Sequence, residues 1–280
     1  MGFVVRNQAL AASTGKQTVK QVNWFTARYL GARALLRMMR WLKNWPDVWS
    51  AYRNRLPLPM FRFRRGFTLH HGPADEPLLL LYEIFVEGCY SNNKIRDGMI
   101  IDLGANIGAA TLCWASQSAK ITVHAYEPNP VTNQTLRRNI EVNNLSDRVT
   151  IYNDAVGREA GEVQLWADVP SLLATSYGVS PATNGTVIRV PMVDLNEVLR
   201  RAGGEQISLL KIDTEGAEAD ILEGVSLPRL RSIRRIVLEY HDSLCPDAYI
   251  RCKQILDQAG FRVQTSPINA NQGLLYAWQD

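Results

Sequence analysis

The chain has 280 residues, of which 46% are hydrophobic, and this is enough to bury one large core with a small appendage. No run of about 18 uncharged apolar residues occurs, which argues against a membrane-spanning helix. Met1–Leu10 carries Arg6 and Asn7 within its apolar stretch, which argues against a signal peptide. The four cysteines form no C-x-x-C pair, so we expect reduced thiols in a cytoplasmic protein.

Charge divides the chain into two unequal parts. The first 70 residues hold 13 of the 31 basic residues but only one acidic residue, Asp47. The remainder is acidic, because it holds 18 basic and 26 acidic residues. This asymmetry predicts a basic N-terminal extension over residues 1–75 and a second domain over residues 76–280.

The extension contains a basic amphipathic segment. From Val22 to Trp49, Trp, Leu and Met recur at spacings of three and four with arginines between them, which predicts a helix ending near Asn44–Pro46. The favoured interpretation is that the apolar stripe packs on the second domain or on a partner subunit in a homo-oligomer. The alternative is attachment to an anionic inner membrane surface or an acidic substrate. Arg53–Arg65 predicts a turn and a short strand, and its aromatic–arginine alternation alone does not favour nucleic-acid binding.

The rest of the chain alternates between apolar strands and amphipathic helices. This pattern predicts an α/β fold with a doubly wound, mostly parallel sheet, closed by an antiparallel strand at its edge. We expect helices at residues 77–90, 107–116, 131–144, 195–201, 217–223 and 248–258. We expect strands at residues 99–103, 121–126, 149–152, 162–166, 187–190, 207–212, 233–239, 261–265 and 274–278.

The first strand of the alternation leads into a glycine turn. It ends in the run Asp102-Leu103-Gly104-Ala105-Asn106-Ile107-Gly108, and a helix follows. Glycines allow the backbone to approach a ligand closely, as in nucleotide-binding α/β domains. Asn106 stands where a dinucleotide fingerprint has its second glycine, and the pattern resembles the first motif of class I S-adenosylmethionine-dependent methyltransferases.

Acidic residues end each of the five strands that we expect to be parallel. They are Asp102, Glu127, Asp154, Asp213 and Glu239. Because the carboxyl ends of parallel strands meet at one edge, these groups predict a site there. Glu127 stands 19 residues beyond Gly108, where a carboxylate can accept both hydroxyls of a ribose. Asp154 is expected at an adenine edge. Asp102 either meets the ligand's ammonium group or only stabilises the turn.

Four motifs together resemble the FkbM-type methyltransferase family. They are Ile101–Gly108, Tyr126–Pro130, Asn153–Gly157 and Leu210–Glu218, and the similarity covers about residues 80–280. The resemblance implies S-adenosylmethionine as cofactor, a Rossmann-like class I fold and O-methylation of hydroxyls. The expected cofactor residues are Asp102, Gly104, Asn106, Gly108, Glu127, Asp154 and Ala155.

The catalytic residues are expected on the next two strand ends. We predict His241 as general base, with Asp213 and Glu239 orienting it or the substrate. The less favoured alternative is that Asp213 and Glu239 hold a divalent metal, as the resemblance to catechol-type methyltransferases suggests. Glu218 is expected to be structural, whereas the role of Glu215 stays open.

The predicted function is methyl transfer to a hydroxyl of a sugar, glycolipid or secondary metabolite, with the polar loop 167–186 contributing to the acceptor site. Two alternatives remain: an NAD-dependent oxidoreductase, against which Asn106 argues, and a non-catalytic membrane or nucleic-acid adaptor. We expect deletion of residues 1–70 to leave cofactor binding intact.

Overall fold

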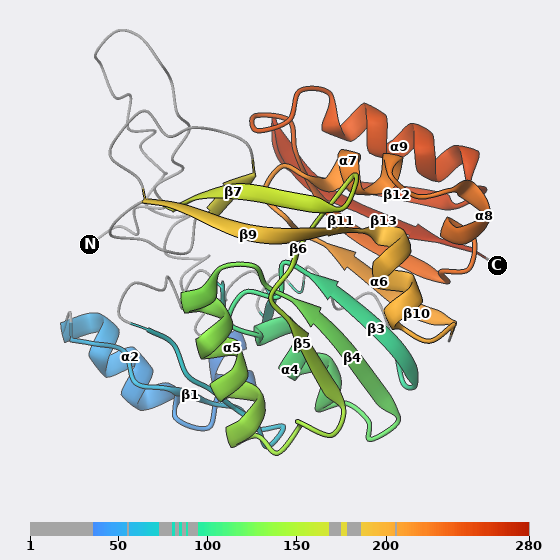
Figure 1. Ribbon diagram of the computed structural model, residues 1–280. Helices are drawn as coiled ribbons and strands as arrows, with labels where there is room; N and C mark the ends of the chain where they lie inside the picture. Colours follow the sequence, from blue (N-terminus) through green and yellow to red (C-terminus); the bar gives the residue numbers. More distant parts are fainter. Residues whose placement is uncertain are drawn as a thin grey trace, which may run out of the picture.

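The computed structural model describes residues 36–54, 56–72, 80–81, 84–85, 88, 95–167, 175–177, 186–204 and 206–279. A seven-stranded sheet in the order β12-β13-β11-β10-β3-β4-β5 forms its centre (Figure 1). The strands are β3 (Gly98–Leu103), β4 (Ile121–Tyr126), β5 (Val149–Tyr152), β10 (Ile207–Ile212), β11 (Arg235–His241), β12 (Arg262–Asn269) and β13 (Gln272–Trp278). The five strands from β11 to β5 are parallel, and β13 is antiparallel to both of its neighbours.

Helices cover both faces of this sheet, as the doubly wound prediction requires. They are α4 (Ala109–Ala115), α5 (Pro130–Val142), α6 (Leu195–Arg201), α7 (Glu218–Glu223), α8 (Leu227–Leu230) and α9 (Ala248–Gln258). Ile100 packs with Leu112 and Leu136 on one face, whereas its neighbour Ile101 packs with Val198 and Leu256 on the other. Burial on both sides explains why the central strands are continuously apolar rather than alternating.

The expected elements of the α/β region agree with the structure within a few residues, with two differences. The predicted antiparallel strand is β13, but it lies one place inside the edge, because the chain turns sharply after β12 and returns between β12 and β11. Residues Ala155–Gly157, for which no strand was expected, form β6 and pair with a strand outside the central sheet. The predicted helix at residues 77–90 lies mostly outside the described residues.

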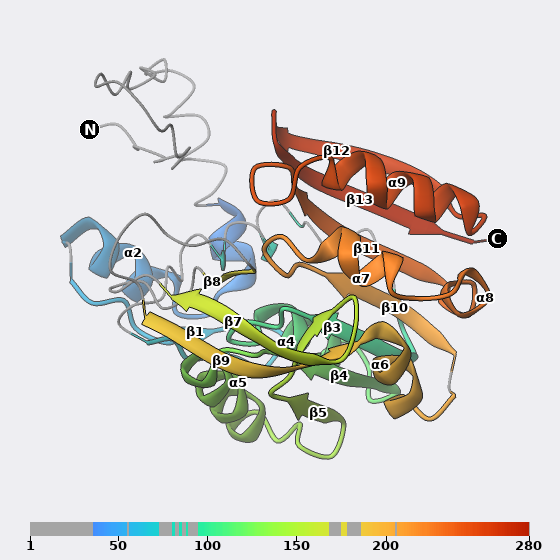
Figure 2. The ribbon, with the colours of Figure 1, turned by 45° about the horizontal axis from the view of Figure 1, so that its top comes forward.

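A second sheet extends over one side of the central one. Its order is β6-β9-β7-β8, with β7 (Gly161–Ala167), β8 (Thr175–Tyr177) and β9 (Thr186–Asp194). Figure 2 shows β7 and β9 as a long ribbon that passes in front of the central sheet. Both strands expected here are confirmed, and each is longer than predicted.

The described part of the N-terminal extension packs against α4 and α5 (Figure 1). Residues 36–41 are helical, and a new helix, α2 (Trp45–Asn54), begins after a short break. The expected single helix is therefore interrupted where the fully buried Leu42 bridges to Phe63. Met38 and Trp41 pack against the same core, which supports the packing interpretation for this part of the stripe. Residues 22–35 lie outside the described residues.

Asparagine side chains of α5 fix the short hairpin of β1 (Phe61–Arg62) and β2 (Thr68–Leu69) to the α/β unit. The amide of Asn143 accepts from the N–H of Thr68 at 2.8 Å and donates to its carbonyl at 2.7 Å. Asn139 makes the same pair of bonds with His70, at 2.8 and 2.9 Å. The extension is thus joined to the second domain by core packing and by backbone hydrogen bonds. No helix among the described residues is long and apolar enough to cross a membrane.

Candidate active site

The glycine turn lies directly against the end of β10. Gly104 has a φ of +77°, and a Cβ at this position would stand 1.8 Å from the carbonyl oxygen of Asp213. Gly108 has a φ of +90°, and a Cβ there would stand 2.5 Å from a methyl carbon of Leu136. Asn106 takes the left-handed conformation at φ 51°, which asparagine tolerates better than most residues. At Gly104 the positive φ and the lack of room for a Cβ both require glycine. The turn can therefore pass close to the ends of β3 and β10.

Glu127 extends from the end of β4 beneath this turn. Its two carboxylate oxygens accept the N–H groups of Asn106 and Asn129, each at 2.9 Å. Burial raises the pKa of Glu127 to about 7, although the two backbone hydrogen bonds act in the opposite direction. Each oxygen keeps a further lone pair for a hydroxyl donor, so the geometry fits the predicted contact with a ribose diol.

The structure gives Asp154 a protein partner. Its Oδ2 lies 2.5 Å from Nη1 of Arg201, whose guanidinium stacks 5.0 Å above the ring of Tyr152. Ala155 is buried in β6. The ion pair with Arg201 occupies one of the two carboxylate oxygens of Asp154. The expected contact of Asp154 with adenine stays a prediction.

Asp102 is fully buried below the turn. It accepts the hydroxyl of Thr111 at 2.6 Å, and its other oxygen lies 3.2 Å from Nζ of Lys211. Lys211 also donates to the carbonyl of Gly104 at 2.7 Å and lies 3.4 Å from Asp213. These contacts favour the turn-stabilising role that was the alternative for Asp102.

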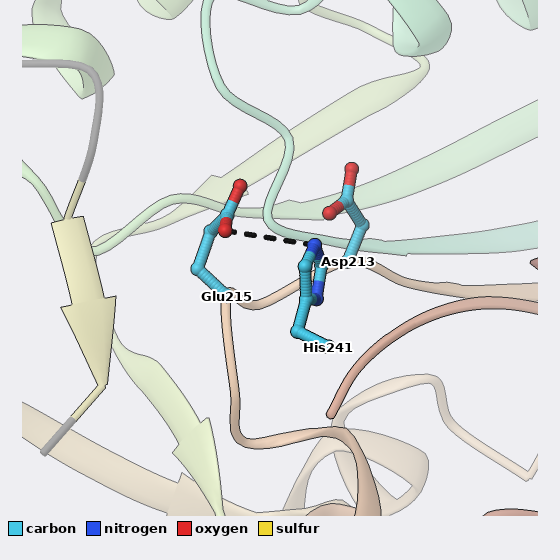
Figure 3. Close-up of side chains that lie close together, drawn as sticks. All are labelled: Asp213, Glu215 and His241. Atoms are coloured by element: carbon cyan, nitrogen blue, oxygen red, sulfur yellow. Dashed lines mark ion pairs between the residues drawn. The ribbon is translucent and has the colours of Figure 1, made fainter. Parts of the chain in front are cut away.

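A histidine surrounded by carboxylates occupies the ends of β10 and β11. Nδ1 of His241 lies 3.3 Å from Glu218, while Nε2 lies 3.6 Å from Glu215 and 3.7 Å from Glu239. Figure 3 shows the carboxylates of Asp213 and Glu215 on either side of the imidazole. The structure thus brings together all three predicted catalytic residues and adds Glu215, the residue left open by the sequence.

This environment bears on the general-base role predicted for His241. Burial alone would lower the pKa of the imidazole, but the hydrogen bond to Glu218 and the charges of Glu215, Glu218 and Asp213 raise it to about 10. The raised pKa favours the protonated ring, which is a poor proton acceptor, and the general-base role of His241 stays a prediction. For Glu239, burial and the charge of Asp213 raise the pKa to about 8.

Glu218 is structural, as expected, but its role is wider than a favourable helix-end charge. One of its oxygens accepts from the N–H groups of Thr214 and Gly216, at 3.1 and 3.0 Å, besides contacting His241.

Gln272 also contacts the cluster and was not predicted from the sequence. Its amide donates to Glu239 and lies 3.4 Å from Nε2 of His241, because β13 places it opposite His241 in register. No local pattern marks this residue.

The inserted antiparallel strand, the glycine turn and the carboxylates at five strand ends define a class I S-adenosylmethionine-dependent methyltransferase. The model of the methyltransferase FkbM domain matches residues 102–263, and the chain belongs to this family.

Curated relatives agree with this assignment. The 31-O-demethyl-FK506 methyltransferase FkbM of Streptomyces tacrolimicus is 30% identical, over 65% of this chain and 81% of that protein. Methyltransferase 1 of Beauveria bassiana is 30% identical, over 70% of this chain and 86% of that protein. A precorrin-6y C5,15-methyltransferase structure from Geobacter metallireducens has a TM-score of 0.43 at 14% identity, covering 69% of this chain and 87% of that one. Family membership decides against the oxidoreductase alternative.

Proposed function

We propose that the protein methylates a hydroxyl oxygen of a small-molecule acceptor, a sugar, glycolipid or secondary metabolite. The observation that carries this proposal is the carboxylate and histidine cluster at the ends of β10 and β11, immediately beside the glycine turn. A hydroxyl must lose a proton as it is methylated, and a cluster of proton-accepting groups next to the cofactor turn suits that reaction. The name of the Streptomyces relative, which specifies methylation at an oxygen, supports the same choice.

The cofactor supplies an electrophilic methyl group on a sulfonium. The acceptor oxygen forms the new bond to the methyl carbon, the carbon–sulfur electron pair stays on sulfur, and the hydroxyl proton passes to the cluster. Glu127 and the Gly104 turn would hold the nucleoside, while Asp213 and Glu239 would position the hydroxyl in line with the methyl group. Because the charged His241 is not free to accept the proton, we assign proton acceptance to a carboxylate of the cluster.

Product mass tests this proposal. The full chain is incubated with S-adenosylmethionine and a panel of hydroxylated, aminated and thiolated acceptors, and products are identified by mass and fragmentation. We expect a methyl ether as product. Methyl transfer only to nitrogen, carbon or sulfur would overturn the assignment to oxygen.

A variant separates catalysis from cofactor binding. We expect Asp213→Asn to lower kcat by about 100-fold or more with little change in cofactor affinity, because Asp213 belongs to the cluster that we propose to accept the hydroxyl proton. Glu141→Gln, an exposed carboxylate on α5, is the matched control and should retain full activity.

A further inference from the structure

We propose that Asp213, Glu215 and His241 together bind a divalent metal ion at the methyl-transfer site. This inference rests on the proposed hydroxyl methylation, because it names what would activate the acceptor. The ligand set differs from the pair considered from the sequence, Asp213 and Glu239. Gln272 donates a hydrogen bond to Glu239, and Glu215 replaces Glu239 as a ligand.

The donor atoms of these three side chains converge. One ligand atom from each lies within 4.8 Å of the other two, and Nε2 of His241 lies 3.6 Å from Oε2 of Glu215. Ligands about 2.1 Å from one ion lie roughly 3–4 Å apart, so modest side-chain rotation brings the three into range. In Figure 3 a ring nitrogen of His241 is directed between the two carboxylates.

A buried carboxylate outside the set fixes the imidazole for this task. Glu218 is fully buried, and its Oε1 lies 3.3 Å from Nδ1 of His241. Nδ1 is thereby held as the donor, and Nε2 is turned toward Glu215. A carboxylate behind the second ring nitrogen is the usual support for a metal-binding histidine.

The charges around the imidazole favour a cation. Glu215, Glu218 and Glu239 each lie within 3.7 Å of a ring nitrogen of His241, and a ligand atom of Asp213 lies within 4.8 Å of those of Glu215 and His241. Lys211, the cation next to Asp213, is shared with the fully buried Asp102. A divalent ion would offset the remaining negative charge and displace the proton of His241, whose ring would then bind in its neutral form.

The ligand types indicate the class of metal and its use. An imidazole with two carboxylates suits Mn²⁺, Fe²⁺ or Zn²⁺ better than Ca²⁺, which prefers oxygen ligands alone. Three protein ligands leave coordination positions for the acceptor hydroxyl, whose pKa a metal lowers. Glu215 has a half-exposed side chain, so the ion would face the side from which an acceptor arrives.

Mn²⁺ binding to the full chain tests the site without any acceptor. We expect one Mn²⁺ per chain by electron paramagnetic resonance titration, and at least tenfold weaker binding for Glu215→Gln and His241→Gln. Glu141→Gln should bind as the unmodified protein does. Circular dichroism checks that each variant is folded. If the variant of the buried His241 unfolds, the variant of the partly exposed Glu215 still tests the site.

Absence of stoichiometric Mn²⁺ binding, or equal binding by the Glu215 variant, would overturn the metal site. Methyl transfer that continues unchanged in a strong chelator would do the same while leaving the proposed function intact. Failure of hydroxyl methylation with Mn²⁺ bound would instead count against the function and not against the site.

Discussion

Oε2 of Glu127 accepts the N–H of Asn106 at 2.9 Å, so the carboxylate that we propose to bind the ribose and the glycine turn are held together by one hydrogen bond. The left-handed backbone of Asn106 directs that N–H toward β4, and the side chain of Asn106 in turn accepts the N–H of Ile107 at 2.6 Å. Two elements that we propose to contact the cofactor are therefore held together before any ligand arrives.

Glu127→Gln is expected to weaken S-adenosylmethionine binding by about 10- to 100-fold, since an amide offers one acceptor oxygen and no charge to the ribose hydroxyls. Isothermal titration calorimetry measures the change. Glu141→Gln serves as control and should bind normally. A Glu127→Gln protein with unchanged affinity would remove Glu127 from the cofactor site.

Cofactor affinity should depend on pH through the same residue. The pKa of Glu127 is raised to about 7, so below pH 7 the group is largely protonated and must release a proton to accept two hydroxyl donors. Affinity should rise between pH 6 and 8 and then level off. Calorimetry at pH 6.5 in buffers of different ionisation enthalpy measures the released proton, which should be absent in Glu127→Gln.

Gly104→Ala is expected to destabilise the fold by about 3 kcal/mol or more, because its Cβ would overlap the Asp213 carbonyl and φ is positive. Gly161→Ala is the matched control, since nothing lies within 4 Å of a Cβ there and no positive φ is required. Urea unfolding of both variants gives the comparison. Equal stability would mean that the turn does not approach β10 this closely.

Leu42→Ala should cost about 2–5 kcal/mol of unfolding free energy, because the side chain is fully buried in the core shared with α4 and α5. Leu36→Ala, at a position 64% exposed, should change stability by less than about 0.5 kcal/mol. Thermal or urea unfolding distinguishes the two variants.

The same packing revises the expected result of truncation. Deleting residues 1–70 removes Leu42, Phe61 and Phe63 from the core, so we now expect loss of folded protein and not a domain that binds cofactor normally. Recovery of a truncated protein with normal cofactor affinity would contradict this.

The sequence predicts the α/β order well because apolar strands and amphipathic helices leave local patterns. Leu195–Arg201 and Ala248–Gln258 are found at the expected residues, and Asp194 marks the start of the first by accepting the N–H of Glu197 at 2.8 Å. The strand-end carboxylates follow from the same order, since parallel strands share one edge.

Properties that depend on distant partners are not visible in the sequence. The position of Gln272 beside His241 requires β13 to insert between β12 and β11, and nothing near residue 272 indicates this. The charge state of His241 depends on Glu215 and Glu218, which stand more than twenty residues earlier in the chain. Leu42 was expected within one continuous helix, and its bridge to Phe63, which interrupts that helix, has no local signal.

The insertion of β13 also sets an order of assembly during synthesis. β13 follows β11 and β12 in the chain but lies between them, so β11 keeps an open edge until residues 272–278 have left the ribosome. An unpaired strand edge readily joins other chains. The strand that carries Glu239 and His241 is thus open to such pairing in the nascent protein until β13 inserts, and Gln272 joins the cluster after the other members.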